Sequence, residues 1–299
     1  MVPSPRAWFH GPARFSVLAI GAGFLVVALP IGLLAWFSLT AAETSLRREI
    51  EAHSLSEARG IALHLERMFH EHAVLLNSIA TGPLFLEALK RRDRTGVLGQ
   101  LEALAALDPH IEGVFAATAD GRLWANYPKT PDAWGRDVSA LPGIKGAVEK
   151  EGPHVSEVHE RIMGTPGFVF AVTVPVRDDG RILGVLGMLG TLEGLGAMLE
   201  SLMPGTAQMY IVDQKGRMAF HSGRPEIGPP ADFSSVRPVR EVLAGRDGVV
   251  EYENPLEKDG PRISAFAPVR GFGWGAVVET PVEKSLAPIR RLRRMVTIF

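Results

Sequence analysis

Aromatic and cationic side chains gather between Trp124 and Phe170, and their types suit the binding of a small organic anion. Arg and Lys side chains donate charge-assisted hydrogen bonds to carboxylates, and aromatic rings provide apolar walls. Each residue, taken singly, is better explained as an ordinary strand, capping or surface residue, and the hypothesis is that some of them together line a pocket. The candidates are an aromatic wall (Trp124, Tyr127 and Trp134), four partners for an anion (Arg136, Lys145, His159 and Arg161) and Phe170.

Metal ligands and catalytic groups do not converge in this sequence. The segment HVSEVHE, from His154 to Glu160, is predicted to be one strand, so its two histidines point to opposite faces. Only Glu157 and His159 share a face, and two ligands rarely hold a metal ion. No nucleophile with a base and an orienting group is recognisable. We therefore expect no metal, no cofactor and no enzyme activity, and an extracytoplasmic enzyme is the weakest interpretation.

Glycines in this chain form turns and strands. Asp-Gly pairs at 120–121, 179–180, 247–248 and 259–260 are typical of tight turns, where glycine supplies the positive φ. The run Gly184, Gly187 and Gly190 lies within a predicted strand, whereas a nucleotide-binding loop needs a strand-to-helix turn. We expect no nucleotide site there.

The composition excludes several classes of partner. The 299 residues carry a formal net charge of −1, so there is no basic surplus for a nucleic acid. The chain contains no cysteine, which excludes disulfides, thiolate metal sites and a cysteine nucleophile. A chain of this length has room for about two domains.

An uncharged run from Phe15 to Ala42 is long enough to cross a membrane, which takes about 20 apolar residues of helix. A cleavable signal peptide is the alternative, but its apolar core is usually about 7–15 residues. Arg6 and Arg14 precede the run and Glu43 follows it. The positive-inside rule then places residues 1–14 in the cytoplasm, 15–42 in the membrane and the rest outside the cell membrane.

The chain's last segment, 285–299, joins a cluster of arginines to five apolar or neutral residues. We interpret it as the start of a second, truncated membrane segment. A basic amphipathic helix on a membrane surface is the alternative.

Residues 43–80 predict one long stalk helix. Ile61, Leu65, Met68, His72, Leu75 and Ile79 repeat at heptad spacing. Such a stripe packs against a second copy of the helix or along a domain, and we expect both along the stalk. The sequence thus predicts a homodimer through the stalk helix.

A block of sequence occurs twice in the remaining chain. Gly121-Arg122 returns as Gly216-Arg217 about 95 residues later, and Pro175-Val176-Arg177 returns as Pro268-Val269-Arg270. Each copy reads strand-strand-helix-strand-strand-strand. The predicted fold class is α+β, with two PAS-like modules at 81–202 and 203–284, each a five-stranded antiparallel sheet with helices on one face.

The chain resembles the double Cache family of extracytoplasmic sensor domains. The residues that carry the resemblance are the ADGRLW hairpin at Asp120-Gly121, Gly135-Arg136-Asp137-Val138, the PVRDDGRILGVLG hairpin and the APVRGFGWGAVVE strand pair. The resemblance implies a membrane-distal module (81–202) that binds a ligand and a membrane-proximal module (203–284) that passes the signal onward. It also implies an output domain of the histidine kinase, cyclic-dinucleotide enzyme or chemoreceptor type.

The family's amino-acid-binding branch carries an Arg-x-Trp-Tyr run and a later Asp, and neither is found here. The matching positions are Leu141-Pro142-Gly143-Ile144 and Leu189. A zwitterion needs a cation and an anion, so we do not expect an α-amino acid ligand. The favoured function is ligand sensing by a membrane receptor in the cell (inner) membrane. The alternative is a protein-docking or structural dimerisation module without a small ligand.

Overall fold

The computed structural model describes residues 12–108, 111–162, 164–202, 208–223, 230–254 and 260–298. The chain divides into two units, 1–50 with 283–299, and 51–282. Residues 1–11 of the expected cytoplasmic segment, the module boundary at 203–207, Asp259 of the fourth Asp-Gly turn, and Phe299 lie outside the described residues.

The first unit consists of helical segments. Helix α1 (Pro12–Ala80) begins in it, and α7 (Val282–Ile298) makes up nearly all of the rest. By length and composition, α1 is the one helix in the described part of the chain that is able to cross a membrane. Leu29, Leu34 and Phe37 are more than half exposed on it, as apolar side chains facing lipid would be.

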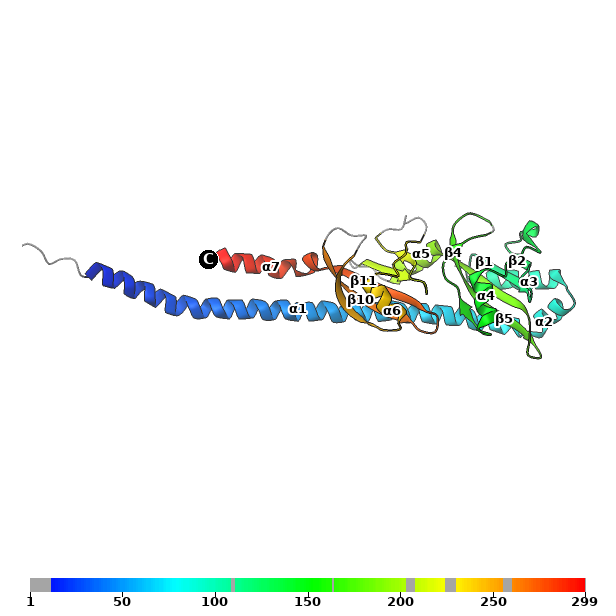
Figure 1. The fold of residues 1–299 in the computed structure, drawn as a ribbon, viewed down its shortest axis with the longest axis horizontal. Coiled ribbons are helices and arrows are strands. Elements are labelled where there is room, and N and C mark those ends of the chain that lie inside the picture. The colour runs from blue at the N-terminus through cyan, green and yellow to red at the C-terminus, as the bar shows by residue number, and fades with distance from the viewer. Residues whose placement is uncertain are drawn as a thin grey trace, which may run out of the picture. The chain divides into compact units, whose positions relative to one another are not determined.

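The second unit contains both sheets, and the membrane-distal module comes first along the chain (Figure 1). The distal sheet has the strand order β2-β1-β6-β5-β3, and β4 also pairs with β5. The pairing is antiparallel throughout. Its elements are α2 (Pro83–Lys90), α3 (Arg94–Ala105), β1 (Gly113–Thr118), β2 (Leu123–Tyr127), η1 (Pro131–Ala133), α4 (Pro142–Glu149), β3 (His154–Val155), β4 (His159–Glu160), β5 (Phe168–Asp178), β6 (Arg181–Thr191) and α5 (Leu192–Leu202).

The proximal module repeats this topology in the order β8-β7-β11-β10-β9. The α+β class and the two antiparallel sheets are therefore confirmed. The elements are β7 (Gln208–Val212), β8 (Met218–His221), α6 (Arg237–Leu243), β9 (Gly248–Glu253), β10 (Pro261–Val269) and β11 (Trp274–Pro281).

Two details of the distal module differ from expectation. The strand predicted at His154–Glu160 is two short strands. Between them Ser156 N–H still donates to Ala171 O of β5, whereas Ser156 O and Val158 N–H bond with the other module. Helices also lie on both faces of the sheet. Val114 and Ala116 belong to the apolar cluster that contains α1, whereas Phe115 and Ala117 belong to the cluster that contains α4. Adjacent strand residues face opposite sides, so α1 and α4 cover different faces.

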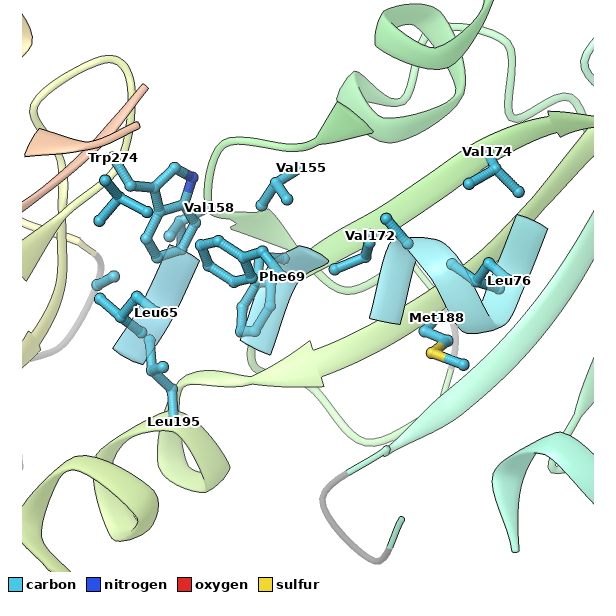
Figure 2. Close-up of a cluster of buried hydrophobic side chains, with 14 of the residues drawn as sticks. Leu65, Phe69, Leu76, Val155, Val158, Val172, Val174, Met188, Leu195 and Trp274 are labelled. Carbon is cyan, nitrogen blue, oxygen red and sulfur yellow. The ribbon is translucent and has the colours of Figure 1, made fainter. Parts of the chain in front are cut away.

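The stalk part of α1 supplies much of the core (Figure 2). Leu65, Phe69 and Leu76 are fully buried against side chains of β5, β6 and α5, and against Trp274 of the proximal module. Ile61 of the predicted heptad stripe is buried too, and Met68, Leu75 and Ile79 are partly buried in the same cluster. This stripe therefore packs against the chain's own modules and is not available to a second copy.

Candidate functional site

The hairpin β1–β2 is joined to the loop that follows it, and glycine makes this possible. Gly121 has φ +75°, and a Cβ there would overlap with Ser139. The loop then bonds along the hairpin: Val138 N–H donates to Gly121 O, and Leu123 N–H donates to Arg136 O. The proximal module repeats this close approach: a Cβ on Gly216 would overlap with Ser234. The glycine at this turn is therefore needed in both copies of the repeat.

Helix α4 covers the sheet closely because two of its residues are glycines. A Cβ on Gly146 would overlap with the His154 ring, and one on Gly143 would lie 3.0 Å from the Ala171 Cβ. The Thr173 hydroxyl donates to Gly143 O at 2.8 Å and holds the start of the helix. Burial lowers the pKa of His154, so this histidine is a neutral packing residue.

A hollow remains between the loop, α4 and the sheet. It encloses about 400 Å³ of empty space, part of it open solvent. Gly187 contributes to its shape, since any Cβ there would overlap with the Phe115 ring. Its lining is Phe115, Leu123, Val138, Leu141, His159, Arg161, Ile162, Val169 and Leu189.

Two polar side chains line this otherwise apolar hollow, which we call the distal pocket. Arg161 is 13% exposed and donates from Nη1 to Glu112 Oε1 at 2.7 Å, but its buried Nε–H has no hydrogen-bond partner in the described structure. Burial lowers the pKa of His159. Its Nδ1–H donates to Glu157 O at 3.0 Å, which leaves Nε2 as an acceptor. The pocket thus offers one unused donor and one acceptor.

The predicted site residues separate into groups. His159 and Arg161 line the distal pocket, and Trp134 packs against the apolar cluster beside it, with its Nε1–H donating to Asn126 at 2.8 Å. Arg136 donates to the carbonyl of Ile162, a lining residue, at 3.1 Å. Lys145 is exposed on α4 and pairs with Glu149.

The other three candidates lie on the opposite face of the sheet. Trp124 and Tyr127 pack against the α1 cluster, and Phe170 is buried in it, edge to face with Phe69 at a centroid distance of 5.7 Å. They therefore do not form a wall of the distal pocket. Trp124 lies on the opposite face because a β-bulge between Ala116 and Ala117 makes it the extra residue of β2, beside Ala125.

Sequence reasoning missed the apolar lining of the pocket. Phe115, Leu123 and Val169 were not among the candidates, and Leu189 was considered only as the position of the family's Asp. Alternation along β1 and β6 was the available signal, because Phe115 and Leu189 fall on the α4 face, opposite Val114 and Met188.

At the equivalent positions of the proximal module, long polar side chains meet one another. Glu279 and Arg262 are buried, with 3.8 Å between Oε2 and Nη1. Asn254 donates to Glu279 at 2.8 Å, and the Tyr252 hydroxyl also donates to it. Among the described residues, no three His, Cys, Asp or Glu side chains lie close enough to hold a metal.

The comparisons with solved structures give the same two-module fold. The ligand-binding domain of the Pseudomonas aeruginosa chemoreceptor PctB, solved with L-Arg, has a TM-score of 0.63 at 18% identity, over 80% of this chain and 98% of that one. The extracellular domain of the putative histidine kinase mmHK1S-Z3 has a TM-score of 0.64 at 15% identity, over 83% and 98%. The sensory domain of the Campylobacter jejuni chemoreceptor Tlp1 has 0.64 at 14%, over 81% and 99%.

No curated protein matches the sequence significantly. A family model described as "Cache domain", in its double form, matches residues 41–289 and so covers the stalk and both modules. The chain therefore belongs to the double Cache family, and it is an extracytoplasmic ligand-sensing region of the kind found in chemoreceptors and histidine kinases.

Proposed function

We propose that the distal pocket binds a small molecule with an apolar body and one acceptor group, such as a short aliphatic carboxylate. The observation that carries this is the unpartnered, buried Nε–H of Arg161 in an apolar hollow. A buried donor without a partner costs free energy, and a ligand carboxylate oxygen removes that cost. The apolar lining adds about 25 cal/mol for each Å² of apolar ligand surface that it buries.

An α-amino acid fits this lining poorly. No carboxylate is among the residues that line the pocket, so an ammonium group has no anion to meet there. The positions where the family's amino-acid branch has polar side chains are Leu141 and Leu189, and both line the pocket. The L-Arg bound by PctB is thus a property of that receptor.

Calorimetric titration of the full chain tests this proposal. We expect binding by one or more of propionate, butyrate, valerate and hexanoate, and none by the α-amino acids or alkylamines of the same length. Arg161→Gln should weaken binding at least 10-fold. Lys145→Gln is the matched control, since Lys145 is exposed and pairs only within α4. Binding of amino acids, or equal loss in both variants, contradicts the proposed ligand. No binding at all favours the protein-docking alternative.

We further propose that residues 1–14 are cytoplasmic, that 15–42 cross the membrane, and that both modules are exported. The charge pattern around the apolar run supports this orientation. The absence of cysteine makes it simple to test, because Lys145→Cys would be the single thiol. A membrane-impermeant maleimide should label it in intact cells. Labelling only after lysis would reverse the orientation.

The outer face of the stalk is our proposed dimer contact. Gly60, Leu63, Arg67, His70 and Val74 are exposed at heptad spacing, and Leu63 and Val74 are 56% and 54% exposed. This stripe lies opposite the one that the modules cover, and heptad spacing suits a two-helix contact. Leu63→Cys should form an intermolecular disulfide under mild oxidation, whereas Leu65→Cys, fully buried, should not.

A further inference from the structure

The two modules touch through a dense set of hydrogen bonds, which we call the module junction. It joins residues 155–158 of the distal module to the turn 213–217 and Trp274 of the proximal module. Gln214 Nε2 donates to Val155 O at 3.1 Å, and Trp274 Nε1–H donates to Ser156 O at 3.3 Å. Lys215 also pairs with Glu157. Ser156 also keeps its bond to Ala171 O of β5, at 2.8 Å, so the junction contacts add to the edge of the distal sheet.

Asp213 lies at the centre of the junction. Its side chain is fully buried. Oδ1 accepts from Lys215 N–H at 2.8 Å and Arg217 N–H at 3.0 Å, which closes its own turn. Oδ2 accepts from Val158 N–H at 2.9 Å, across the junction, and from Arg217 Nε at 3.1 Å. Oδ1 therefore bonds only within the turn, whereas Oδ2 bonds both with Arg217 of the turn and with the neighbouring module.

The internal repeat shows that the turn alone does not need an aspartate. Thr118 occupies the same place in the distal hairpin, where its hydroxyl accepts from Arg122 N–H at 3.0 Å. The backbone bonds of the two turns are the same: Thr118 N–H to Arg122 O, and Asp213 N–H to Arg217 O, both at 2.9 Å. A threonine closes the turn with one oxygen. The additional oxygen of Asp213 is explained by the contact with Val158.

We infer that Asp213, in the proximal module, is a positioning residue for the distal ligand pocket. Val158 is followed directly by His159, and Arg161 comes two residues later, so the backbone that Asp213 holds carries both polar groups of the pocket. Ser156 still bonds with Ala171 of β5, so the bond from Val158 N–H to Asp213 is the one that holds the backbone directly before β4. The inference rests on the proposed function, because the pocket whose polar groups Asp213 positions is the proposed ligand site.

The bond between Asp213 and Val158 also couples ligand binding in the distal pocket to the proximal module. If the junction favours the arrangement of His159 and Arg161 that binds ligand, then bound ligand favours the junction by the same free energy. The proximal module thereby responds to occupancy of the distal pocket. Arg217 lies between them: it bonds with Asp213, and after burial its charge is a further cause of the lowered pKa of His159.

The test is hydrogen exchange on the full chain in detergent, without ligand, comparing the natural protein with Asp213→Thr. This substitution keeps the oxygen that closes the turn, as Thr118 does, and removes the one that reaches Val158. We expect exchange at 156–162 to rise at least 10-fold, with β1 and β10 unchanged. Asp232→Asn is the matched control: Asp232 is exposed, in the same module, and accepts from Ser234 N–H. It should leave exchange at 156–162 unchanged.

Two results would overturn the inference. One is exchange at 156–162 within twofold of the natural protein. The other is faster exchange throughout both sheets, which would make Asp213 a general stability residue. If Asp213→Thr does not fold, Trp274→Phe keeps an aromatic side chain and removes the bond to Ser156 O. Exchange at 156–158 must then rise, or the inference fails. Because no ligand is used, a failed carboxylate titration would reject the proposed ligand and leave this result standing.

Discussion

The distal and proximal sheets have the same strand pairing but carry different side chains at equivalent positions. In the distal module the register places apolar side chains around a hollow, and in the proximal module it places a buried polar network in the same position. The strand pairings of the two sheets show which positions are equivalent. Four residues of the distal pocket have the following equivalents in the proximal module: Phe115 corresponds to Tyr210, His159 to Tyr252, Val169 to Arg262, and Leu189 to Glu279.

The difference is one of side-chain volume and charge. Long polar side chains from β9, β10 and β11 meet in the proximal module and satisfy one another: Arg262 donates to Gln208, and Tyr252 donates to Glu279. Shorter apolar ones leave space in the distal module and leave Arg161 Nε unpartnered. A network that satisfies itself needs no ligand, whereas an unpartnered donor beside empty space does. The comparison supports the proposal that the ligand binds in the distal module.

The largest effect should come from breaking the proximal network. Glu279→Leu places the distal residue at this position and leaves the buried Arg262 without its carboxylate. We expect the free energy of unfolding to fall by about 3–5 kcal/mol, as for a buried ion pair that loses one partner. Chemical denaturation measures it.

The paired substitution sharpens this test. Glu279→Leu with Arg262→Val copies both distal residues and leaves no buried charge, so the double variant should be more stable than Glu279→Leu alone. A double variant that is equally or less stable would show that the polar network contributes beyond its ion pair.

A smaller effect should follow from filling the distal hollow. Gly187 matches Val277 in the proximal sheet, and its Cβ would overlap with the Phe115 ring. Gly187→Val should displace that ring into the pocket, abolish ligand binding and cost about 1–3 kcal/mol of stability through overpacking. Calorimetric titration and thermal unfolding measure the two results separately. Retained affinity would place the ligand elsewhere.

The fold could be predicted from the sequence because the internal repeat, the glycine turns and the spacing of the apolar residues all indicate the same two modules. Asp120-Gly121 and its copy at Gly216 fixed the hairpins, and both modules followed from them. The site was harder. Arg161 and His159, chosen by chemical type, line the distal pocket, whereas Trp124, Tyr127 and Phe170 lie on the other face of the sheet, Trp124 because of the bulge in β2. A bulge shifts a strand's faces by one residue, and nothing in the local composition of β2 marks it.

The module junction could not be predicted from the sequence, for a different reason. Asp213 reads as an ordinary turn aspartate, since turns favour that residue. Its second oxygen acts on Val158, a contact that depends on how two modules pack. The heptad stripe of α1 was recognised, but only packing shows that Leu65 and Phe69 face the chain's own core.

Acid should act on the distal module before the proximal network. Burial lowers the folded-state pKa of His154 and of His159, whereas in the unfolded chain each titrates near about 6.5. The unfolded state therefore binds protons more readily as pH falls below about 6.5, and stability is lost from there down to the folded pKa values. We expect the melting temperature to fall between about pH 6.5 and pH 5.

Replacing His159 separates this effect from general acid denaturation. His159→Asn should reduce the loss of stability across that interval, and His53→Asn, on the exposed face of α1, should not. Equal acid sensitivity in both variants would mean that burial of His159 does not control this interval.

The smallest effect on stability should come from the outer face of the stalk. Leu63 is 56% exposed whereas Leu65 is fully buried, because two residues along a helix are about 200° apart around its axis. Leu63→Glu should change the free energy of unfolding by no more than about 0.5 kcal/mol, the usual range for exposed positions. It should nevertheless abolish disulfide formation by a cysteine placed at Val74, because two glutamates would oppose each other in the proposed dimer. Undiminished cross-linking would mean that the two copies meet through another surface, and the stalk's outer face would then be solvated along its length.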